Sequence, residues 1–194
     1  TKTGTIMSRN RLKLSPSQVH HPPTPIIAAQ MMEPNRLLDE VHLAAVRPIG
    51  GGFVLDMGRN YTGWFELALP DDIARGTKIE IEFADKQFAN GGFQTYGQRS
   101  VYVARGGGGE RFRNRFNYAA FRYAIVKGLP RAPRPDEVKG RLITTGYESG
   151  STFSCDNQLL NEIHGMICWT YKCLSLGGYT VDCPHRERLG YGGD

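Results

Sequence analysis

Long hydrophobic runs are missing from this sequence: no stretch of 18 consecutive residues is apolar. A membrane-spanning helix needs about 20 mostly apolar residues, so none is expected and no membrane partner is predicted. Residues 1–25 also lack the apolar core of a secretory signal. They are basic and interrupted by prolines, and we expect an irregular lead-in. The first residue, Thr1, leaves open a true N-terminus further upstream.

Cysteine is scarce and unevenly placed, since all four cysteines lie in the last 40 residues, at Cys155, Cys168, Cys173 and Cys183. A small disulfide-stabilised secreted domain would distribute its cysteines through the fold. No CxxC knuckle accompanies the nearby His164 and His185, so the spacing argues against zinc. We therefore predict no metal and no other cofactor. Unpaired cysteines favour a reducing compartment, which makes the cytoplasm slightly preferred.

Nucleic-acid motifs are also absent, although 24 Lys and Arg against 19 Asp and Glu give a net charge of +5. The densest basic run is ERFRNRFNY (110–118), in which arginines alternate with Phe112, Phe116 and Tyr118. This alternation is typical of a strand with one solvated and one buried face. We predict a solvated strand face here and no nucleic-acid partner.

Short apolar runs separated by glycine and proline breaks fill residues 26–150. FVLDMG (53–58) and GWFELALP (63–70) are interrupted by residues 59–62, and KIEIEF (78–83) alternates with period two. Three further strands are expected at SVYVAR (100–105), FRYAIVKG (121–128) and GRLITT (140–145). Short strands at this spacing predict an antiparallel β-sandwich, and the chain as a whole is expected to be mainly β.

The pattern becomes helical in FSCDNQLLNEIHGMICWTYKCLSL (153–176), with a helix expected at about 156–174. Apolar side chains recur at helical spacing around most of its circumference, and Ser154 or Asp156 is a plausible N-cap. Only about 20 residues follow this helix. We therefore expect residues 151–194 to begin a helical domain that is incomplete. The helix must then leave part of its apolar stripe exposed or fold it back on the sheet.

The last stretch, YTVDCPHRERLGYGGD (179–194), places Asp182, Glu187 and Asp194 among prolines, glycines and basic residues. Carboxylates on a rigid loop suit glycoside hydrolysis, because one protonates the leaving oxygen and others bind sugar hydroxyls. Tyr191 can offer a ring face to a sugar. Mixed-charge loops are more often simply solvated, so the residues alone leave both interpretations open.

Four motifs in order resemble those of bacterial α-L-rhamnosidases. VDCPHRERLGYGGD resembles their signature D-C-P-x-R-x-E-R-x-G-[WY]-x-G-D or a close variant, and DMGRNYTGW (56–64) resembles D-x-G-Q-N-x-x-G-W of the preceding sandwich. NYAAFRYAIVKG (117–128) resembles that domain's closing strand. FSCDNQLLNEIHGMICWT (153–170) resembles the first helix of an (α/α)₆ barrel. The resemblance implies a β-sandwich followed by the first helix and active-site loop of a truncated barrel.

The resemblance also implies roles for residues of the loop. Glu187 corresponds to the general acid of an inverting mechanism, with simple ion pairing to an arginine as the alternative. Asp182 and Asp194 correspond to ligands of rhamnose hydroxyls, although Asp182 alternatively caps or fixes the loop. Arg186 binds sugar or orders the loop, and Tyr191 stacks on sugar or fills the core.

Three departures from the family pattern are evident. Arg59 replaces a glutamine, and LGGYTVDCP replaces a stretch that commonly ends in P-T-D-C-P. The general base of the family lies far downstream, and no residue of this chain corresponds to it. In the sandwich, we expect Asp56 and Asn60 to hold backbone amides and Trp64 to fill the core, rather than to bind sugar.

These observations predict part of a glycoside hydrolase that removes terminal α-L-rhamnose from a glycan or glycoside and is inactive as this chain alone. One alternative is a non-catalytic carbohydrate-binding sandwich module, and another is a structural remnant without either activity. Rhamnose binding distinguishes a binding module from a remnant. A downstream barrel with a second glutamate identifies the parent as an enzyme.

Overall fold

The structure is a computed structural model that describes residues 28–190 of the chain. The chain divides into two units, Thr1–Met31 and Met32–Asp194, and the second contains all the helices and strands described below. The lead-in expected at residues 1–25 and the first two positions of the expected sandwich lie outside the described residues.

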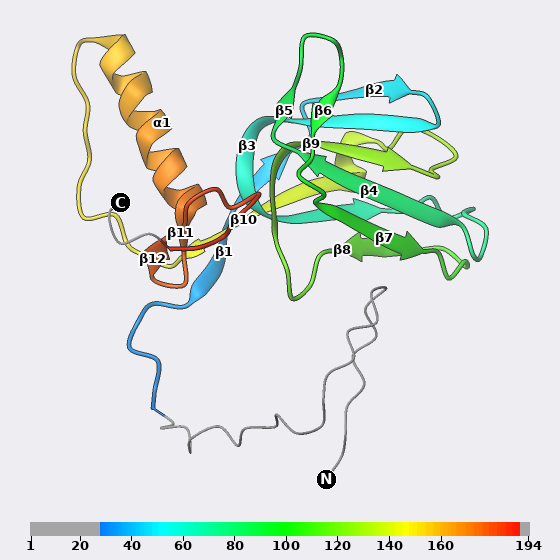
Figure 1. Ribbon diagram of the computed structural model, residues 1–194, viewed down its shortest axis with the longest axis horizontal. Coiled ribbons are helices and arrows are strands. Elements are labelled where there is room, and N and C mark those ends of the chain that lie inside the picture. The colour runs from blue at the N-terminus through cyan, green and yellow to red at the C-terminus, as the bar shows by residue number, and fades with distance from the viewer. Residues whose placement is uncertain (1–27, 191–194) are drawn as a thin grey trace, which may run out of the picture. The chain divides into compact units, whose positions relative to one another are not determined.

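Eight antiparallel strands form one hydrogen-bonded sheet, in which β1, β10, β3, β9, β4 and β7 are successive neighbours and β2 and β8 pair with β3 (Figure 1). The mainly antiparallel β prediction is therefore confirmed. The eight strands are β1 (Asn35–His42), β2 (Ala45–Ile49), β3 (Gly52–Ala68), β4 (Lys78–Ala84), β7 (Arg99–Val103), β8 (Arg111–Arg113), β9 (Ala119–Lys127) and β10 (Val138–Thr145). A separate hairpin is formed by β5 (Lys86–Gln87) and β6 (Phe93–Gln94).

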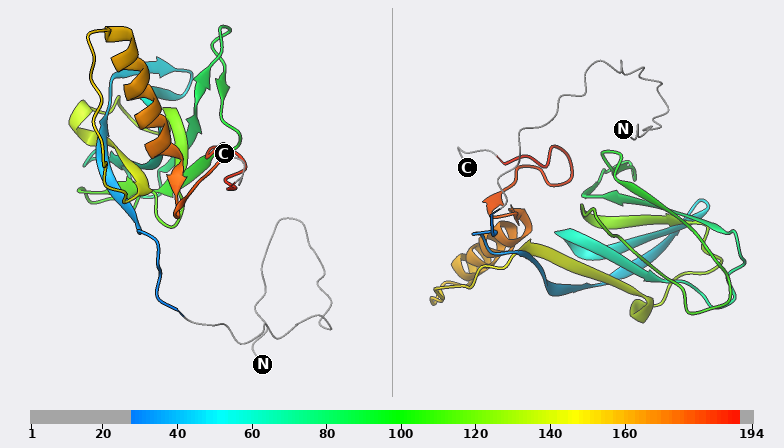
Figure 2. Two further views of the ribbon diagram at one scale, coloured as in Figure 1. Left: turned by 90° about the vertical axis from the view of Figure 1, so that its left-hand side faces the viewer. Right: turned by 90° about the horizontal axis from the view of Figure 1, so that it is seen from below.

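The longest strand, β3, corrects one expectation from the sequence. Residues 59–62 were expected to separate two strands, but β3 runs through them for 17 residues. The break is instead a shift in the pairing register with β9 between Asp56 and Tyr61. The first half of β3 pairs with β2, and the second half pairs with β10 and β8. This irregularity accompanies a strongly curled sheet (Figure 2).

The inner face of the curled sheet carries the hydrophobic core. Alternation in β4 is confirmed, because Ile79 and Ile81 are fully buried and Phe83 is 1% exposed. The Phe83 ring lies 4.6 Å from the ring of Phe121 in β9. Phe121 also lies 4.6 Å from Tyr61, at the register shift of β3. Aromatic rings at these separations pack favourably and tie the central strands together.

The strand expected over residues 110–118 is too long. β8 ends at Arg113, and the buried Asn114 then accepts a hydrogen bond from the Phe65 backbone amide at 3.2 Å. Phe112 is buried as expected, whereas Phe116 is fully exposed with a φ of 61°. The Asn114 side chain also donates a hydrogen bond to the Ser100 hydroxyl at 3.3 Å, and both bonds stabilise the turn that ends the strand.

The expected helix is present as α1 (Gln158–Leu174), but its N-cap is Asn157 rather than Ser154 or Asp156. The Asn157 side chain accepts hydrogen bonds from the backbone amides of the next turn. As expected, the apolar stripe is largely exposed, at Leu159, Leu160, Ile163, Met166, Ile167 and Tyr171. Within the described residues, no helix combines the length and apolar character needed to cross a membrane.

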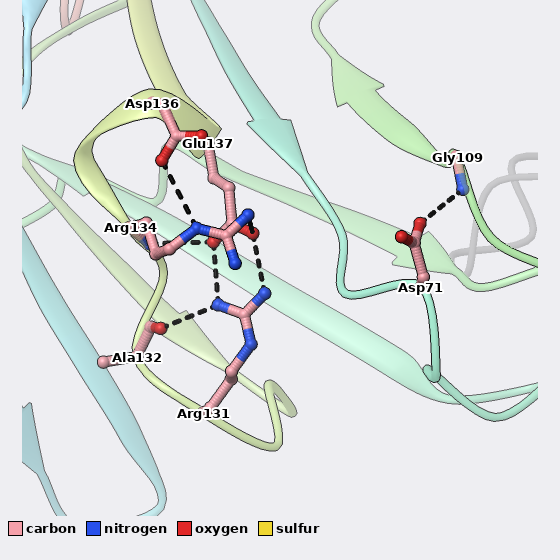
Figure 3. A network of polar contacts seen from close by, with 7 residues as sticks. All are labelled: Asp71, Gly109, Arg131, Ala132, Arg134, Asp136 and Glu137. Carbon is pink, nitrogen blue, oxygen red and sulfur yellow. Dashed lines mark hydrogen bonds and ion pairs between the residues drawn. The ribbon is translucent and has the colours of Figure 1, made fainter.

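An ion-pair network stabilises the turn before β10 (Figure 3). Glu137 ends the short 3-10 turn Pro135–Glu137, and its side chain is 7% exposed. Arg131 donates two hydrogen bonds to this carboxylate, at 2.6 and 2.8 Å. The backbone amide of Arg134 donates a third, at 2.8 Å. The Arg131 hydrogen bonds are the main reason that the pKa of Glu137 falls to about 2.

Candidate active-site loop

The chain continues from α1 into a hairpin and then into a closed loop. β11 (Ser175–Leu176) pairs with β12 (Tyr179–Thr180), and a β-bridge joins Val181 to Gly190. We call residues 181–190 the acidic loop. Its base is fixed by a hydrogen bond from the Asp182 amide to the Leu189 carbonyl at 2.9 Å, and by the buried Val181. Three predicted site residues, Asp182, Arg186 and Glu187, are held together here.

Two other predicted site residues, Tyr191 and Asp194, lie outside the described residues. Their expected roles in sugar binding stay predictions.

Glu187 is paired with its neighbour in the chain. Arg186 Nε donates a hydrogen bond to Glu187 Oε2 at 2.8 Å, and 35% of the Glu187 side chain is exposed. This hydrogen bond is the main reason that the pKa of Glu187 lies below its usual value. A general acid requires the opposite shift, so the structure has the ion-paired arrangement that the sequence left as an alternative.

Cys183 links the two acidic residues of the loop. Its thiol donates to Asp182 Oδ1 at 3.1 Å, and Arg186 Nη2 donates to the Cys183 sulfur at 3.2 Å. The hydrogen bond to Asp182 is the main reason that the pKa of the Cys183 thiol is raised. A continuous chain of polar contacts thus runs from Asp182 through Cys183 and Arg186 to Glu187.

The same residues contain a potential set of metal ligands that does not follow a CxxC pattern. Asp182, Cys183 and Glu187 each offer a ligand atom, and these atoms lie within 4.8 Å of one another. Thiolate and carboxylate together suit zinc. Arg186 already donates to both Cys183 and Glu187, so its positive charge opposes a cation at this position.

A fourth departure from the family signature lies in the spacing of the loop, which is shorter by one residue. In D-C-P-x-R-x-E-R one residue separates the first arginine from the glutamate, whereas here Glu187 follows Arg186 directly. The match is therefore to a shortened variant of the pattern. The loop also contains two non-glycine residues with positive φ, Cys183 at 41° and Arg188 at 59°. Such angles are unusual for these residue types and indicate a tightly constrained backbone.

The sheet and its connecting segments (residues 35–145), which we call the sheet unit, contact the acidic loop on both sides of Glu187. His185 lies against Tyr96 with ring centroids 4.6 Å apart, and its Nε2 is 3.8 Å from Asp85 Oδ2. The guanidinium of Arg188 lies 4.6 Å from the ring centre of Tyr118. No pattern in the sequence connects Asp85, Tyr96 or Tyr118 with this loop, because each lies far from it along the chain.

A pocket of about 350 Å³ lies where β3, β9, α1 and the acidic loop meet. Asp182 lines this pocket together with Asn60, Trp169 and His185, whereas Glu187 does not. Asp85 also lines it, and its buried Oδ1 has no hydrogen-bond partner in the described part of the chain. A buried carboxylate oxygen without a donor is costly, so this pocket suits a polar occupant.

The motif at residues 56–64 is partly structural, as expected. Asp56 accepts a hydrogen bond from the Gly58 amide at 2.8 Å and pairs with Arg122 at 2.8 Å. Asn60 contributes its backbone carbonyl, which accepts a hydrogen bond from the Trp169 indole at 2.7 Å, whereas its side chain was expected to hold a backbone amide. The expectation for Trp64 is wrong, since its ring lines a surface pocket rather than the core.

Family models match most of the described region. Residues 47–144 match the bacterial alpha-L-rhamnosidase concanavalin-like domain. Residues 148–194 match the bacterial alpha-L-rhamnosidase 6 hairpin glycosidase domain. The chain therefore belongs to the bacterial α-L-rhamnosidase family.

Known relatives agree with this assignment. An alpha-L-rhamnosidase of Streptomyces avermitilis is 34% identical over 87% of this chain, which spans 17% of that relative's length. The crystal structure of the Streptomyces avermitilis alpha-L-rhamnosidase complexed with L-rhamnose has a TM-score of 0.79 and 31% identity, covering 86% of this chain and 17% of that one. The alpha-L-rhamnosidase from Dictyoglumus thermophilum gives a TM-score of 0.78 and 30% identity, covering 85% and 19%.

Proposed function

We propose that this chain supplies the acid side of the active site in a longer inverting enzyme that removes terminal α-L-rhamnose from glycans or glycosides. The observation that carries this proposal is the acidic loop, which holds Asp182, Arg186 and Glu187 together within the six-hairpin match. The relative that was solved with L-rhamnose supports rhamnose as the sugar.

In this proposal Glu187 protonates the glycosidic oxygen as the bond to the aglycone breaks. Its carboxyl must carry a proton before that step, and the hydrogen bond from Arg186 opposes protonation. Substrate binding must therefore separate Arg186 from Glu187 or transfer Arg186 to a sugar oxygen. Asp182 accepts a hydrogen bond from a rhamnose hydroxyl, and Tyr191 and Asp194 complete the sugar contacts.

The general base is assigned to a part of the longer protein outside this chain. An inverting pair needs carboxyl groups roughly 6.5–9.5 Å apart, so that a water molecule fits between them. Asp182 and Glu187 offer ligand atoms within 4.8 Å of each other, which is too close for that arrangement. Asp182 is therefore a poor candidate for the base.

We also propose residues 26–150 and 151–194 as the two domains of the chain.

We accordingly expect the purified 194-residue chain not to hydrolyse p-nitrophenyl α-L-rhamnopyranoside. Release of p-nitrophenolate, followed by absorbance over several hours, measures this. Glu187→Gln in the same chain controls for contaminating activity. Hydrolysis by the unaltered chain that disappears in this variant would reveal a base within these residues and contradict the proposal.

Sugar binding tests the loop independently of hydrolysis. Asp182→Ala is expected to weaken L-rhamnose binding by about 1–3 kcal/mol, because a charge-assisted hydrogen bond is left unmade. Titration followed by NMR chemical shifts measures the affinity. Asp72→Ala, at an exposed acid of the sheet unit, is the matched control. Rhamnose binding that is unaffected by Asp182→Ala would favour a binding module that does not use the loop.

A further inference from the structure

A second pocket on the sheet unit has the composition of a carbohydrate site. Its volume is about 250 Å³, below the range of about 300–1,000 Å³ that drug-sized ligands occupy, so it suits a single ring. It is formed by β1, β3, β10 and the segment between β8 and β9. We call it the aromatic pocket, and its lining includes Arg36, Trp64, Phe116, Asn117 and Tyr118.

Phe116 is the most unusual residue in this pocket. Its side chain is fully exposed, and its φ of 61° is rare for a bulky residue. The backbone conformation costs free energy, and the core does not require it. The backbone on either side is nevertheless anchored, by the buried Asn114 and by the Asn117 carbonyl, which accepts a hydrogen bond from the Trp64 indole at 2.9 Å. The fold therefore directs the Phe116 side chain out into solvent.

The remaining lining combines ring faces with polar groups. The guanidinium of Arg113 lies 5.2 Å from the Trp64 ring centre and helps to orient it. The Arg36 side chain is 59% exposed and forms a long ion pair with Glu33 at 3.7 Å. Within residues 28–190 the Asn117 side-chain amide has no partner, so it is available to hydroxyl groups. Sugars present an apolar face for stacking and hydroxyls at the ring edge, which matches this combination.

The aromatic pocket adjoins the acidic loop through one shared residue. Tyr118 lines the pocket, and its ring also lies 4.6 Å from the Arg188 guanidinium, directly after Glu187 in the chain. A ligand extending from the acidic loop would reach the aromatic pocket next.

We propose that the aromatic pocket binds the pyranose ring next to the terminal rhamnose, with Phe116 and Trp64 as stacking surfaces and Asn117 as a hydrogen-bonding group. This inference rests on the function proposed above, because that function supplies the adjacent rhamnose. It makes the sheet unit a determinant of which glycan is accepted. A single exposed aromatic residue beside hydroxyl-binding groups fits a sugar better than a protein surface, which would need a wider apolar patch.

The chain contains two tryptophans, Trp64 and Trp169, whose indole N–H groups give separate NMR signals, so Trp169, which lines the pocket beside Asp182, is left unaltered. A rhamnosyl-glucose disaccharide is expected to shift the Trp64 signal and to bind about tenfold more tightly than methyl α-L-rhamnopyranoside. Phe116→Gly is expected to remove this advantage, since aromatic stacking contributes on the order of a three- to tenfold change in affinity. Phe153→Ala, at an exposed aromatic residue before α1, is the matched control.

Phe116→Gly also separates a binding role from a structural one. Glycine adopts positive φ without strain, so the variant is expected to melt at a higher temperature than the parent while it binds the disaccharide more weakly. Equal affinities for the disaccharide and the monosaccharide, or unchanged binding by Phe116→Gly, would overturn the inference. If Asp182→Ala weakens binding in that case, the proposed function stands without the aromatic pocket. If only Phe116→Gly weakens binding, the pocket is a sugar site and the role proposed for the loop fails.

Discussion

Replacing Glu187 by glutamine in the longer protein is expected to lower the rate of hydrolysis of a natural rhamnoside by a factor of about 10²–10⁴. Glutamine keeps the size and polarity of the side chain but has no acidic proton to give to the leaving oxygen. Rhamnose binding should change little, so the loss should appear in kcat rather than in KM. Steady-state kinetics on a rhamnosyl-glucose disaccharide measures both quantities.

The leaving group provides an internal check on this role. A p-nitrophenolate leaving group needs little protonation, so Glu187→Gln should reduce its release much less than the release of glucose. Glu162→Gln, at an exposed glutamate of α1 that accepts a hydrogen bond from Gln158, is the matched control. Equal losses for both leaving groups would assign Glu187 a structural role rather than that of the acid.

In the same experiment, the stereochemistry of the product tests whether the second catalytic carboxylate acts as a base or as a nucleophile. We expect the inverted anomer, which NMR detects before mutarotation. Asp182 and Glu187 lie closer together than an inverting pair requires. Retention of configuration would contradict the inverting mechanism and would require a nucleophile close to Glu187, for which Asp182 is the candidate within this chain.

The sequence predicted the elements whose signal is periodic. The alternation of Ile79, Ile81 and Phe83 in β4 and the helical spacing in α1 survive folding, because each follows from which side chains reach the core. The prediction was wrong where a single polar side chain ends a strand by bonding to the backbone of another strand. Asn114 ends β8 after three residues and leaves Phe116 in solvent, although the pattern of alternating arginine and aromatic residues continues.

The candidate site was predictable as a list of residues but not as an arrangement. The motif located Asp182, Arg186 and Glu187, yet pairing of Arg186 with Glu187 depends on side-chain geometry that spacing does not specify. The contacts between the sheet and the acidic loop could not be predicted from the sequence for a related reason. Tyr96 and Tyr118 reach the acidic loop only because the curled sheet brings distant segments together, and no local pattern carries that information.

A large effect on stability is expected from Glu137→Gln at neutral pH. The carboxylate is 7% exposed and accepts hydrogen bonds from Arg131 and from the Arg134 amide. Its pKa of about 2, against an ordinary value of 4.5, corresponds to roughly 3 kcal/mol of stability. Glutamine cannot supply this, because it lacks the charge and has only one acceptor oxygen. Urea unfolding at pH 7 should show a loss approaching that size.

The stability that Glu137 contributes should decrease as the pH is lowered. Because the folded-state pKa is depressed, the contribution of Glu137 is complete above pH 4.5 and is lost as the pH falls towards 2. The difference between the parent and Glu137→Gln should therefore shrink by more than half between pH 6 and pH 3. Asp136→Asn is the matched control, since Asp136 is 75% exposed and pairs with Arg134 at 3.4 Å. Exposed pairs contribute about 0–1 kcal/mol, so this variant should unfold almost like the parent at every pH. Equal unfolding midpoints for the two variants at pH 7 would mean that the network in Figure 3 adds little to the stability of the sheet.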